Sequence, residues 1–418
     1  MKLKPVCVVV FGLGVAIASA QAADDFIDRV EDSLVFSTGQ GELRGRLSGT
    51  LDLEGYHYQL PAPGLLYTDS KTLFSPRLSL FLDAQLGRQL YVFVQSRADR
   101  GFDPGDSHRQ VRLDEYAIRF SPGEGGRFAL QVGKFATVVG NWVERHGSWD
   151  NPFITAPLVY ENLTGVWDAV APDSADMLLR WAHRRPGYLD DGEKEDKEHR
   201  LPVIWGPNYG SGVAVSGQIE KFQYAFELKN AALASRPDRW SVVNQQWQNP
   251  TFSGRLGYRP DEAWSLGFSA SSGPYLLPSA AATLPPGAKP GDFREIVLGQ
   301  DIGYAWHHWQ VWTEVYASRF EVPRVGNADA LSYYAEAKYK FTAQFFGAVR
   351  WNQQLFGDVH DNSGQRLPWG RDTWRIDLAP SYRFTPHTQF KFQYSLQRTA
   401  GPMATWNNIF AVQSTVRF

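Results

Sequence analysis

The carboxy-terminal segment WNNIFAVQSTVRF, residues 406–418, alternates between two kinds of side chain and ends on the aromatic residue Phe418. Alternation with a period of two residues is typical of a β-strand with one apolar and one polar face. Counting back from the end, the mostly apolar positions are Val416, Ser414, Val412 and Phe410. The positions between them, Arg417, Thr415, Gln413 and Ala411, are mostly polar. The segment is therefore predicted to be a strand that separates an apolar from a polar environment.

Segments of about ten residues with the same alternation recur from residue 41 onward, and turn residues separate them. Seventeen such segments can be recognised, Met177–Trp181 among them. A barrel with both ends on one side of a membrane needs an even number of strands. The order of short turns and long loops places one further strand at Asn162–Val170. The pattern predicts eighteen strands, or sixteen if two weak segments are hairpins within loops.

This repeated pattern and the terminal aromatic strand resemble bacterial outer-membrane β-barrels, whose last strand commonly ends in Phe and is read by the barrel-assembly machinery. The resemblance implies an all-β fold, a closed antiparallel transmembrane barrel over residues 41–418 with long outer loops and short periplasmic turns. It also implies the bacterial outer membrane as location and Phe418 as an assembly signal. With eighteen strands, the chain would resemble the specific-channel and alginate-export-like porins.

The amino-terminal residues 1–22 have the features of a secretory signal peptide. Lys2 and Lys4 precede an apolar run that ends in small residues near Ala22. The only cysteine, Cys7, lies in this run, so the mature chain is predicted to lack disulfides and thiolate metal sites. In residues 23–40 the apolar positions recur at helical spacing, which predicts a short helix. This segment is expected to be a periplasmic extension, with a plug or an inter-subunit contact as alternatives.

Composition narrows the class of protein further. No apolar run after residue 22 reaches the roughly 18 residues of a membrane-spanning helix, which excludes a helical membrane protein. The chain nevertheless has 15 Trp, 18 Tyr and 26 Phe, as expected if aromatic residues gather at two membrane interfaces. The net charge of −2 gives no reason to expect a nucleic-acid partner.

The third outer loop, predicted at residues 136–161, mixes charged, aromatic and amide side chains. A channel constriction needs this mixture, because charges set a field and hydrogen-bond partners replace part of the solute's water. The candidate constriction residues are Asn141, Trp142, Glu144, Arg145, His146, Trp149 and Asp150. The alternatives are an outer lid that packs on the barrel rim or, less favoured, a metal or hydrolytic site. No paired-histidine spacing accompanies these residues, so no metal or cofactor is predicted.

Lumen-facing residues follow when the apolar face of each strand is turned to the lipid, where a charge costs roughly 2 to 4 kcal/mol at mid-bilayer. The predicted lumen is wet and carries both signs of charge, although many of these residues are expected to pair across neighbouring strands. The predicted lumen-facing charged residues are Arg44, Arg46, Arg77, Asp83, Arg97, Arg375, Asp377, Arg383 and Lys391.

The function predicted from these features is passive passage of small hydrophilic solutes through a channel constricted by the third loop. The alternatives are a sleeve or scaffold for a partner protein such as a cytochrome, and an outer-membrane enzyme. An enzyme is disfavoured because no Ser/His or Asp/His nucleophile context is recognisable. The charged segment 190–200, DDGEKEDKEHR, is predicted to be a solvated outer loop, with lipopolysaccharide as its alternative contact through divalent ions. The sequence leaves the solute, the ion selectivity and the oligomeric state open.

Overall fold

The structure is a computed structural model. It describes residues 25–39, 42–60, 62–66, 68, 70–101, 109–183, 197, 199–238, 247, 250–401 and 404–418. The predicted signal peptide, residues 1–22, lies outside the described residues.

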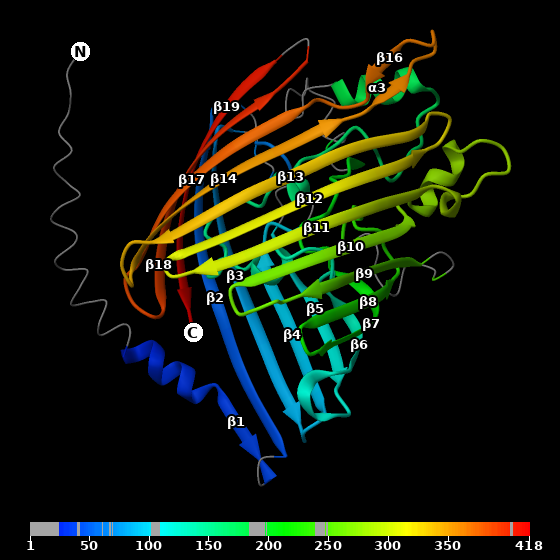
Figure 1. Cartoon of the computed structure of the whole chain (residues 1–418). Helices are drawn as coiled ribbons and strands as arrows, with labels where there is room; N and C mark the ends of the chain where they lie inside the picture. The colour runs from blue at the N-terminus through cyan, green and yellow to red at the C-terminus, as the bar shows by residue number, and fades with distance from the viewer. Residues whose placement is uncertain are drawn as a thin grey trace, which may run out of the picture.

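An antiparallel β-barrel forms the body of the molecule (Figure 1). Each strand pairs with the next along the chain, and the last strand pairs with β2 from Thr50 to Tyr58, which closes the barrel. The barrel strands are β2 (Leu43–Tyr58), β3 (Thr72–Leu86), β4 (Leu90–Asp99), β5 (Gln110–Phe120), β6 (Ala129–Phe135), β7 (Gly210–Ile219), β8 (Phe222–Lys229), β9 (Thr251–Tyr258), β10 (Trp264–Pro274), β11 (Arg294–Trp306), β12 (Trp309–Val322), β13 (Gly326–Lys340), β14 (Phe345–Phe356), β17 (Thr373–Arg383), β18 (Thr388–Thr399) and β19 (Thr405–Arg417).

Shorter elements are not part of this ring of strands. They are β1 (Val35–Thr38), the hairpin of β15 (Asp358–His360) and β16 (Arg366–Pro368), and the helical segments η2 (Glu124–Gly126), η3 (Val143–Arg145), α2 (Leu158–Glu161), α3 (Ala175–His183), η4 (Pro278–Thr283) and η5 (Pro290–Asp292). Among the described residues, no helix is both long and apolar enough to cross a membrane.

In the described part of the chain the closed ring has sixteen strands, so the prediction of eighteen is wrong and the alternative of sixteen is the observed count. Asn162–Val170 makes only an isolated bridge between Trp167 and Arg200, and Met177–Trp181 lies within α3. The buried residues of α3 recur at the spacing of a helix face, which a short apolar run also permits. Both segments therefore belong to the third outer loop, which extends over residues 136–209.

The two faces of each strand differ as the alternation predicts. On β19, Phe410 and Val412 are about 40 % exposed, whereas Gln413 and Thr415 are buried inside the barrel. Exposed aromatic residues gather at the periplasmic ends of the strands, where several form cross-strand pairs. They include Phe222, Tyr258, Trp264, Trp306, Trp309, Phe345, Tyr382 and Phe390. An apolar outer face with an aromatic girdle is the surface that a membrane-spanning barrel presents to lipid.

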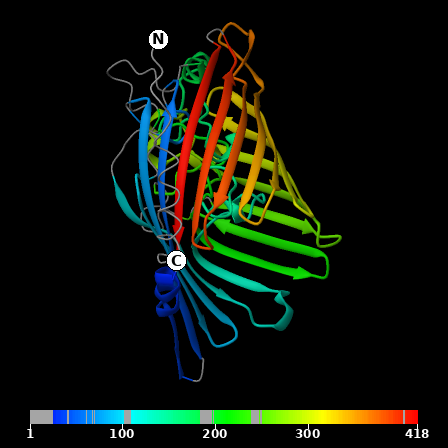
Figure 2. The same ribbon diagram turned by 90° about the vertical axis from the view of Figure 1, so that its left-hand side faces the viewer.

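The amino-terminal segment extends the barrel at its seam. Residues 25–33 form the short helix that the sequence predicts, and β1 pairs with the start of β2, from Leu43 to Arg46. Strands β1 and β19 therefore pair with the same edge of β2, one after the other along its length. Figure 2 shows the helix and the carboxy-terminus at the same end of the molecule. The segment is joined to the barrel by strand pairing rather than loosely attached.

The last residue completes the seam. The backbone N–H and carbonyl of Phe418 both pair with Gly49, with N···O distances of 3.0 and 2.8 Å. The Phe418 ring also lies against this glycine, because a Cβ atom placed on Gly49 would be 2.5 Å from Cζ of Phe418. Gly49 leaves the space that the terminal ring fills.

We expect deletion of Phe418, and separately Gly49→Val, to lower the yield of folded barrel, because each change damages the seam between the first and last strands. The yield is measured as the heat-modifiable band on a semi-native gel. Phe384→Ala, which removes an exposed aromatic ring at a periplasmic turn, is the matched control and should fold as wild type does. Normal folding of both seam variants would contradict the assembly role of Phe418.

Candidate functional site

The first part of the third outer loop, residues 136–161, lies against the inner face of the wall formed by β10 to β18 (Figures 1 and 2). The loop contains η3, α2 and α3, and its backbone donates hydrogen bonds to inward-facing side chains of β10, β12, β14 and β18. Residues 136–161 therefore occupy part of the barrel interior instead of lying on the outer rim.

Glu314 of β12 is the first anchor of this loop. Its carboxylate is fully buried and accepts hydrogen bonds from the backbone N–H groups of Asn141 and Trp142, at 2.5 and 3.0 Å, and from the Tyr160 hydroxyl at 2.7 Å. Gly140 permits this approach, because its φ is +77° and a Cβ atom there would lie 2.1 Å from the Tyr316 hydroxyl. A buried carboxylate is stable only where several donors meet it.

A second anchor consists of three fully buried charges, Arg350, Arg375 and Asp377. Asp377 accepts from Nε of Arg350 at 2.9 Å and from Nε of Arg375 at 3.0 Å. Arg350 donates to the carbonyl oxygen of Thr155 at 3.0 Å, and Arg375 forms an ion pair with Glu161 of α2. The two arginines thus connect the barrel wall to the loop.

Lys391 of β18 forms a third connection to the loop. Its ammonium group donates to the carbonyl oxygens of Ser148 and Asn151, the latter at 2.6 Å. The predicted lumen-facing residues Arg375, Asp377 and Lys391 therefore point inward but lie beneath the loop, where they contact protein and not the solution.

Several predicted constriction residues are also turned toward protein. Arg145 forms an ion pair with Glu336 at 2.6 Å, donates to the Tyr334 hydroxyl at 3.0 Å and lies over the Trp312 ring at 4.3 Å. Trp142 is buried, with its ring centroid 4.4 Å from that of Tyr160. The Asn141 amide lies 3.4 Å from Asp301 of β11. These side chains hold the loop on the wall.

His146 is partly buried between Val143 and Tyr209. Its Nδ1 lies 2.5 Å from the Val143 carbonyl oxygen and its Nε2 lies 2.9 Å from the Tyr209 hydroxyl, so both nitrogens have partners. Burial lowers the pKa of His146 to about 4, and the positive charges of Arg97 and Arg77 act in the same direction. A metal site built on His146 with Glu144 and Asp150 has no free ring nitrogen to use, which disfavours that alternative.

A cavity of about 1270 Å³ separates the third loop from the opposite wall, β2 to β9. Of the predicted constriction residues, Trp142, Glu144, His146, Trp149 and Asp150 line it from the loop, and the carboxylates of Glu144 and Asp150 are exposed. The charged residues that line it from the barrel strands are Arg46, Asp52, Arg77, Asp83, Arg97, Glu115, Arg119, Arg255 and Arg417, and Glu31 lines it from the amino-terminal helix. Acidic loop residues thus face a wall that is rich in arginine.

Most of the wall arginines have a carboxylate partner. Arg77 contacts Glu54 at 2.6 Å and Asp52 at 3.1 Å, and Arg97 contacts Asp114 at 3.1 Å. Arg46 pairs with Glu31, and Asp83 accepts a hydrogen bond from Tyr91. Glu144 and Asp150, by contrast, form no ion pair within the ranges that the structure describes. They are the loop charges that a solute in the cavity would meet.

The remaining predicted residues lie near the periplasmic end. Arg383 lies over the Trp149 ring at 4.8 Å and donates to its carbonyl oxygen at 3.2 Å. Arg44 is exposed on β2 and does not line the cavity. The sequence reasoning missed Glu314, Arg350 and Arg255. The alternation of apolar and polar residues on their strands could have predicted that these side chains point into the barrel. No feature of the sequence predicts which residues they contact.

On the outer side, apolar residues of the third loop form a cluster with the ends of β12 and β13 and with neighbouring loops. The cluster includes Leu163, Val166, Leu178, Leu201, Trp205, Tyr275, Phe320, Val322 and Trp369. Of the predicted charged loop 190–200, only residues 197, 199 and 200 are described. Lys197 and Arg200 are buried, and Lys197 donates to the carbonyl oxygen of Ala62 at 3.0 Å. These two charges are therefore not part of a solvated loop.

No protein-family model matches the chain, and no curated protein matches it in sequence. Solved structures do match over nearly the whole chain. The Salmonella typhi OmpF complex with daunomycin has a TM-score of 0.55 at 11 % identity and covers 92 % of this chain and 100 % of its own. The chain has the fold of an outer-membrane porin barrel.

Two further barrels agree with this comparison. The anion-selective porin from Comamonas acidovorans has a TM-score of 0.53 at 11 % identity, over 90 % of this chain and 100 % of its own. The outer membrane channel DcaP of Acinetobacter baumannii has a TM-score of 0.54 at 9 % identity, over 92 % of this chain and 99 % of its own. At such identities the likeness concerns the fold.

We expect Glu314→Gln to loosen the loop by about 1–3 kcal/mol, because it weakens a buried acceptor shared by three donors. The measurement is protease cleavage within residues 136–161 of the folded, heat-modifiable barrel. Asp329→Asn, which removes an exposed ion pair with Arg319 on the outer face, is the control and should change stability by about 0–1 kcal/mol. Equal cleavage of the two variants would show that Glu314 is not an anchor.

We also expect the loop to loosen in acid. The pKa of His146 in the folded chain, about 4, lies below the usual value of about 6.5. The contribution of His146 to the free energy that holds the loop in place is therefore complete above a pH of about 6.5. It is lost as the pH falls toward 4, by about 1.4 kcal/mol per pH unit. Protease sensitivity of the loop between pH 7.5 and 4.5 measures this loss. His146→Gln should flatten the profile while His308→Gln, at an exposed periplasmic turn, should not.

Proposed function

We propose that the chain is a passive channel of the bacterial outer membrane for small hydrophilic solutes, narrowed by the third outer loop. The observation that carries this proposal is the cavity between the loop and the arginine-rich wall. Exposed Glu144 and Asp150 lie on one side, and Arg119, which contacts Gln131 and no carboxylate among the described residues, lies on the other, so a transverse field crosses the cavity. Such a field orients polar solutes and excludes apolar ones.

The position of the loop supports a channel over a sleeve. A sleeve that holds a folded partner protein needs a wide lumen. Here the loop fills the space against β10 to β18 and is fixed there by buried charges. The remaining cavity of about 1270 Å³ suits small solutes rather than a protein domain. The similar barrels are themselves described as a porin and an outer membrane channel, which fits this proposal.

The location and the other partners follow from the proposed channel. The apolar outer face with its aromatic girdle suits outer-membrane lipid and lipopolysaccharide. The seam formed by Phe418 and Gly49 is the part of the barrel that the assembly machinery would have to close. A channel of this kind needs no cofactor.

We expect purified barrel in a planar bilayer to conduct ions, and Glu144→Gln combined with Asp150→Asn to shift its selectivity toward anions. Removing charges that act within several ångströms of the permeating ion changes its energy by about 0.5–1 kcal/mol, or the permeability ratio by about two- to fivefold. The reversal potential under a salt gradient measures this ratio.

Glu262→Gln is the matched control, because Glu262 is an exposed carboxylate at a periplasmic turn that does not line the cavity. It should leave the reversal potential nearly unchanged, since salt screens exposed charges beyond about 10 Å. A barrel that folds but does not conduct would contradict the channel. A control that shifts the reversal potential as far as the double variant would contradict the role of the loop.

A further inference from the structure

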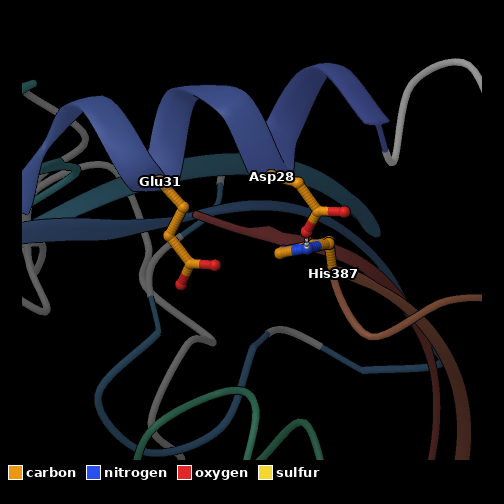
Figure 3. A group of neighbouring side chains, drawn as sticks. All are labelled: Asp28, Glu31 and His387. Atoms are coloured by element: carbon orange, nitrogen blue, oxygen red, sulfur yellow. Dashed lines mark hydrogen bonds and ion pairs between the residues drawn. The ribbon is translucent and has the colours of Figure 1, made fainter.

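Three side chains able to bind a metal ion meet at the periplasmic end of the seam (Figure 3). Asp28 and Glu31 come from the helix of residues 25–33, and His387 comes from the turn between β17 and β18. One oxygen of each carboxylate and one ring nitrogen of His387 all lie within 4.8 Å of one another. Residues three apart on a helix share a face, and Figure 3 shows both carboxylates on the side of the helix that faces His387.

The surroundings of His387 hold its ring in one orientation. The residue is only 5 % exposed, and its Nδ1 lies 3.1 Å from the Arg417 carbonyl oxygen. A carbonyl can only accept, so Nδ1 carries the proton of this contact. This arrangement, a ring N–H held by a backbone carbonyl, is the one that orients histidine ligands in metal sites.

The other ring nitrogen faces the acidic side chains. Nε2 of His387 lies 2.8 Å from Oδ1 of Asp28. In the neutral ring with its proton on Nδ1, Nε2 carries a lone pair, and a carboxylate also offers only lone pairs. Two acceptors at this distance need a positive species between them, which is either a second proton on the ring or a metal ion.

We propose that Asp28, Glu31 and His387 form a binding site for a divalent transition-metal cation of the Zn²⁺ type. One imidazole nitrogen with carboxylate oxygens is a donor set that suits Zn²⁺, and three protein ligands leave room for water. Bond lengths of about 2.0–2.2 Å place ligand atoms about 3.3 Å apart. The gap between His387 and Asp28 therefore widens slightly on binding, and Glu31 moves inward.

The two carboxylates have the freedom that this adjustment requires. The Asp28 side chain is 62 % exposed. Oε1 of Glu31 contacts Arg46 of β2, which leaves Oε2 for an ion. Since only His387 is buried, the site has a fixed ligand on the barrel and two adjustable ligands on the helix.

An ion at this site would fasten the helix of residues 25–33 to the closed end of the barrel. His387 exchanges hydrogen bonds with Arg417 of β19, whose N–H donates to the His387 carbonyl at 2.9 Å. Glu31 contacts β2 through Arg46 and lines the large cavity. The site would therefore join the helix, a periplasmic turn and both seam strands. The proposal does not depend on which solute passes through the barrel.

The first test is Zn²⁺ binding to folded, EDTA-treated full-length barrel in detergent, measured by calorimetry. Wild type should bind one Zn²⁺ per chain, and His387→Ala and the double variant Asp28→Asn, Glu31→Gln should each weaken binding at least tenfold. His308→Ala, which removes an exposed histidine from another periplasmic turn, should bind as wild type does. The double variant changes only helix residues outside the barrel strands, so it remains informative if His387→Ala folds poorly.

The second test follows the helix itself. A spin label on Asp25→Cys reports its mobility, and Cys7 in the predicted signal peptide is the only native cysteine. Zn²⁺ should reduce the mobility of this label, and the double variant should abolish the effect. If Zn²⁺ binds no more tightly to wild type than to the double variant, the proposal is overturned. The contact between His387 and Asp28 is then a hydrogen bond without a metal ion.

Discussion

Buried charges on the inner face of the barrel hold the third outer loop in place, and the rest of the interior depends on them. Glu314, Arg350, Arg375 and Asp377 are fully buried. Removing such groups from water costs several kcal/mol each unless hydrogen bonds and opposite charges compensate. The loop supplies much of that compensation through its backbone N–H and carbonyl groups and through Glu161. Neither the wall nor the loop would be satisfied alone.

This mutual dependence determines where open space remains. With the loop fixed on β10 to β18, the cavity is confined to the side of β2 to β9. Arg145, which could have lined a pore, is used to hold the loop against Glu336 and Trp312. Charge in the cavity then comes from Glu144 and Asp150 on the loop and from the arginines opposite. Charged side chains of the same kinds thus hold the loop at some positions and line the cavity at others.

The closure of the barrel also depends on groups that need a bonding partner. In lipid, every backbone N–H and C=O group of a spanning strand needs a partner, so the first and last strands have to meet. They pair from Thr50 to Tyr58, and Phe418 continues the pairing at Gly49. Strand β1 then covers the rest of the same edge of β2. The amino-terminal segment therefore leaves less of this edge unpaired at the periplasmic end.

The sequence by itself determined the β-barrel architecture, the inward and outward faces of the strands and the terminal seam strand. Period-two alternation and turn residues are local properties, so they can be recognised without knowing the neighbours. The tertiary structure decided the strand number and the partners of the charges. Met177–Trp181 alternates well enough for a strand but is helical, because it packs as one face of α3 within an apolar cluster. Arg375 and Arg77 both face inward, yet only the packing of the loop buries the first and leaves the second at the cavity. Such outcomes depend on contacts between residues far apart in the chain, which alternation alone does not encode.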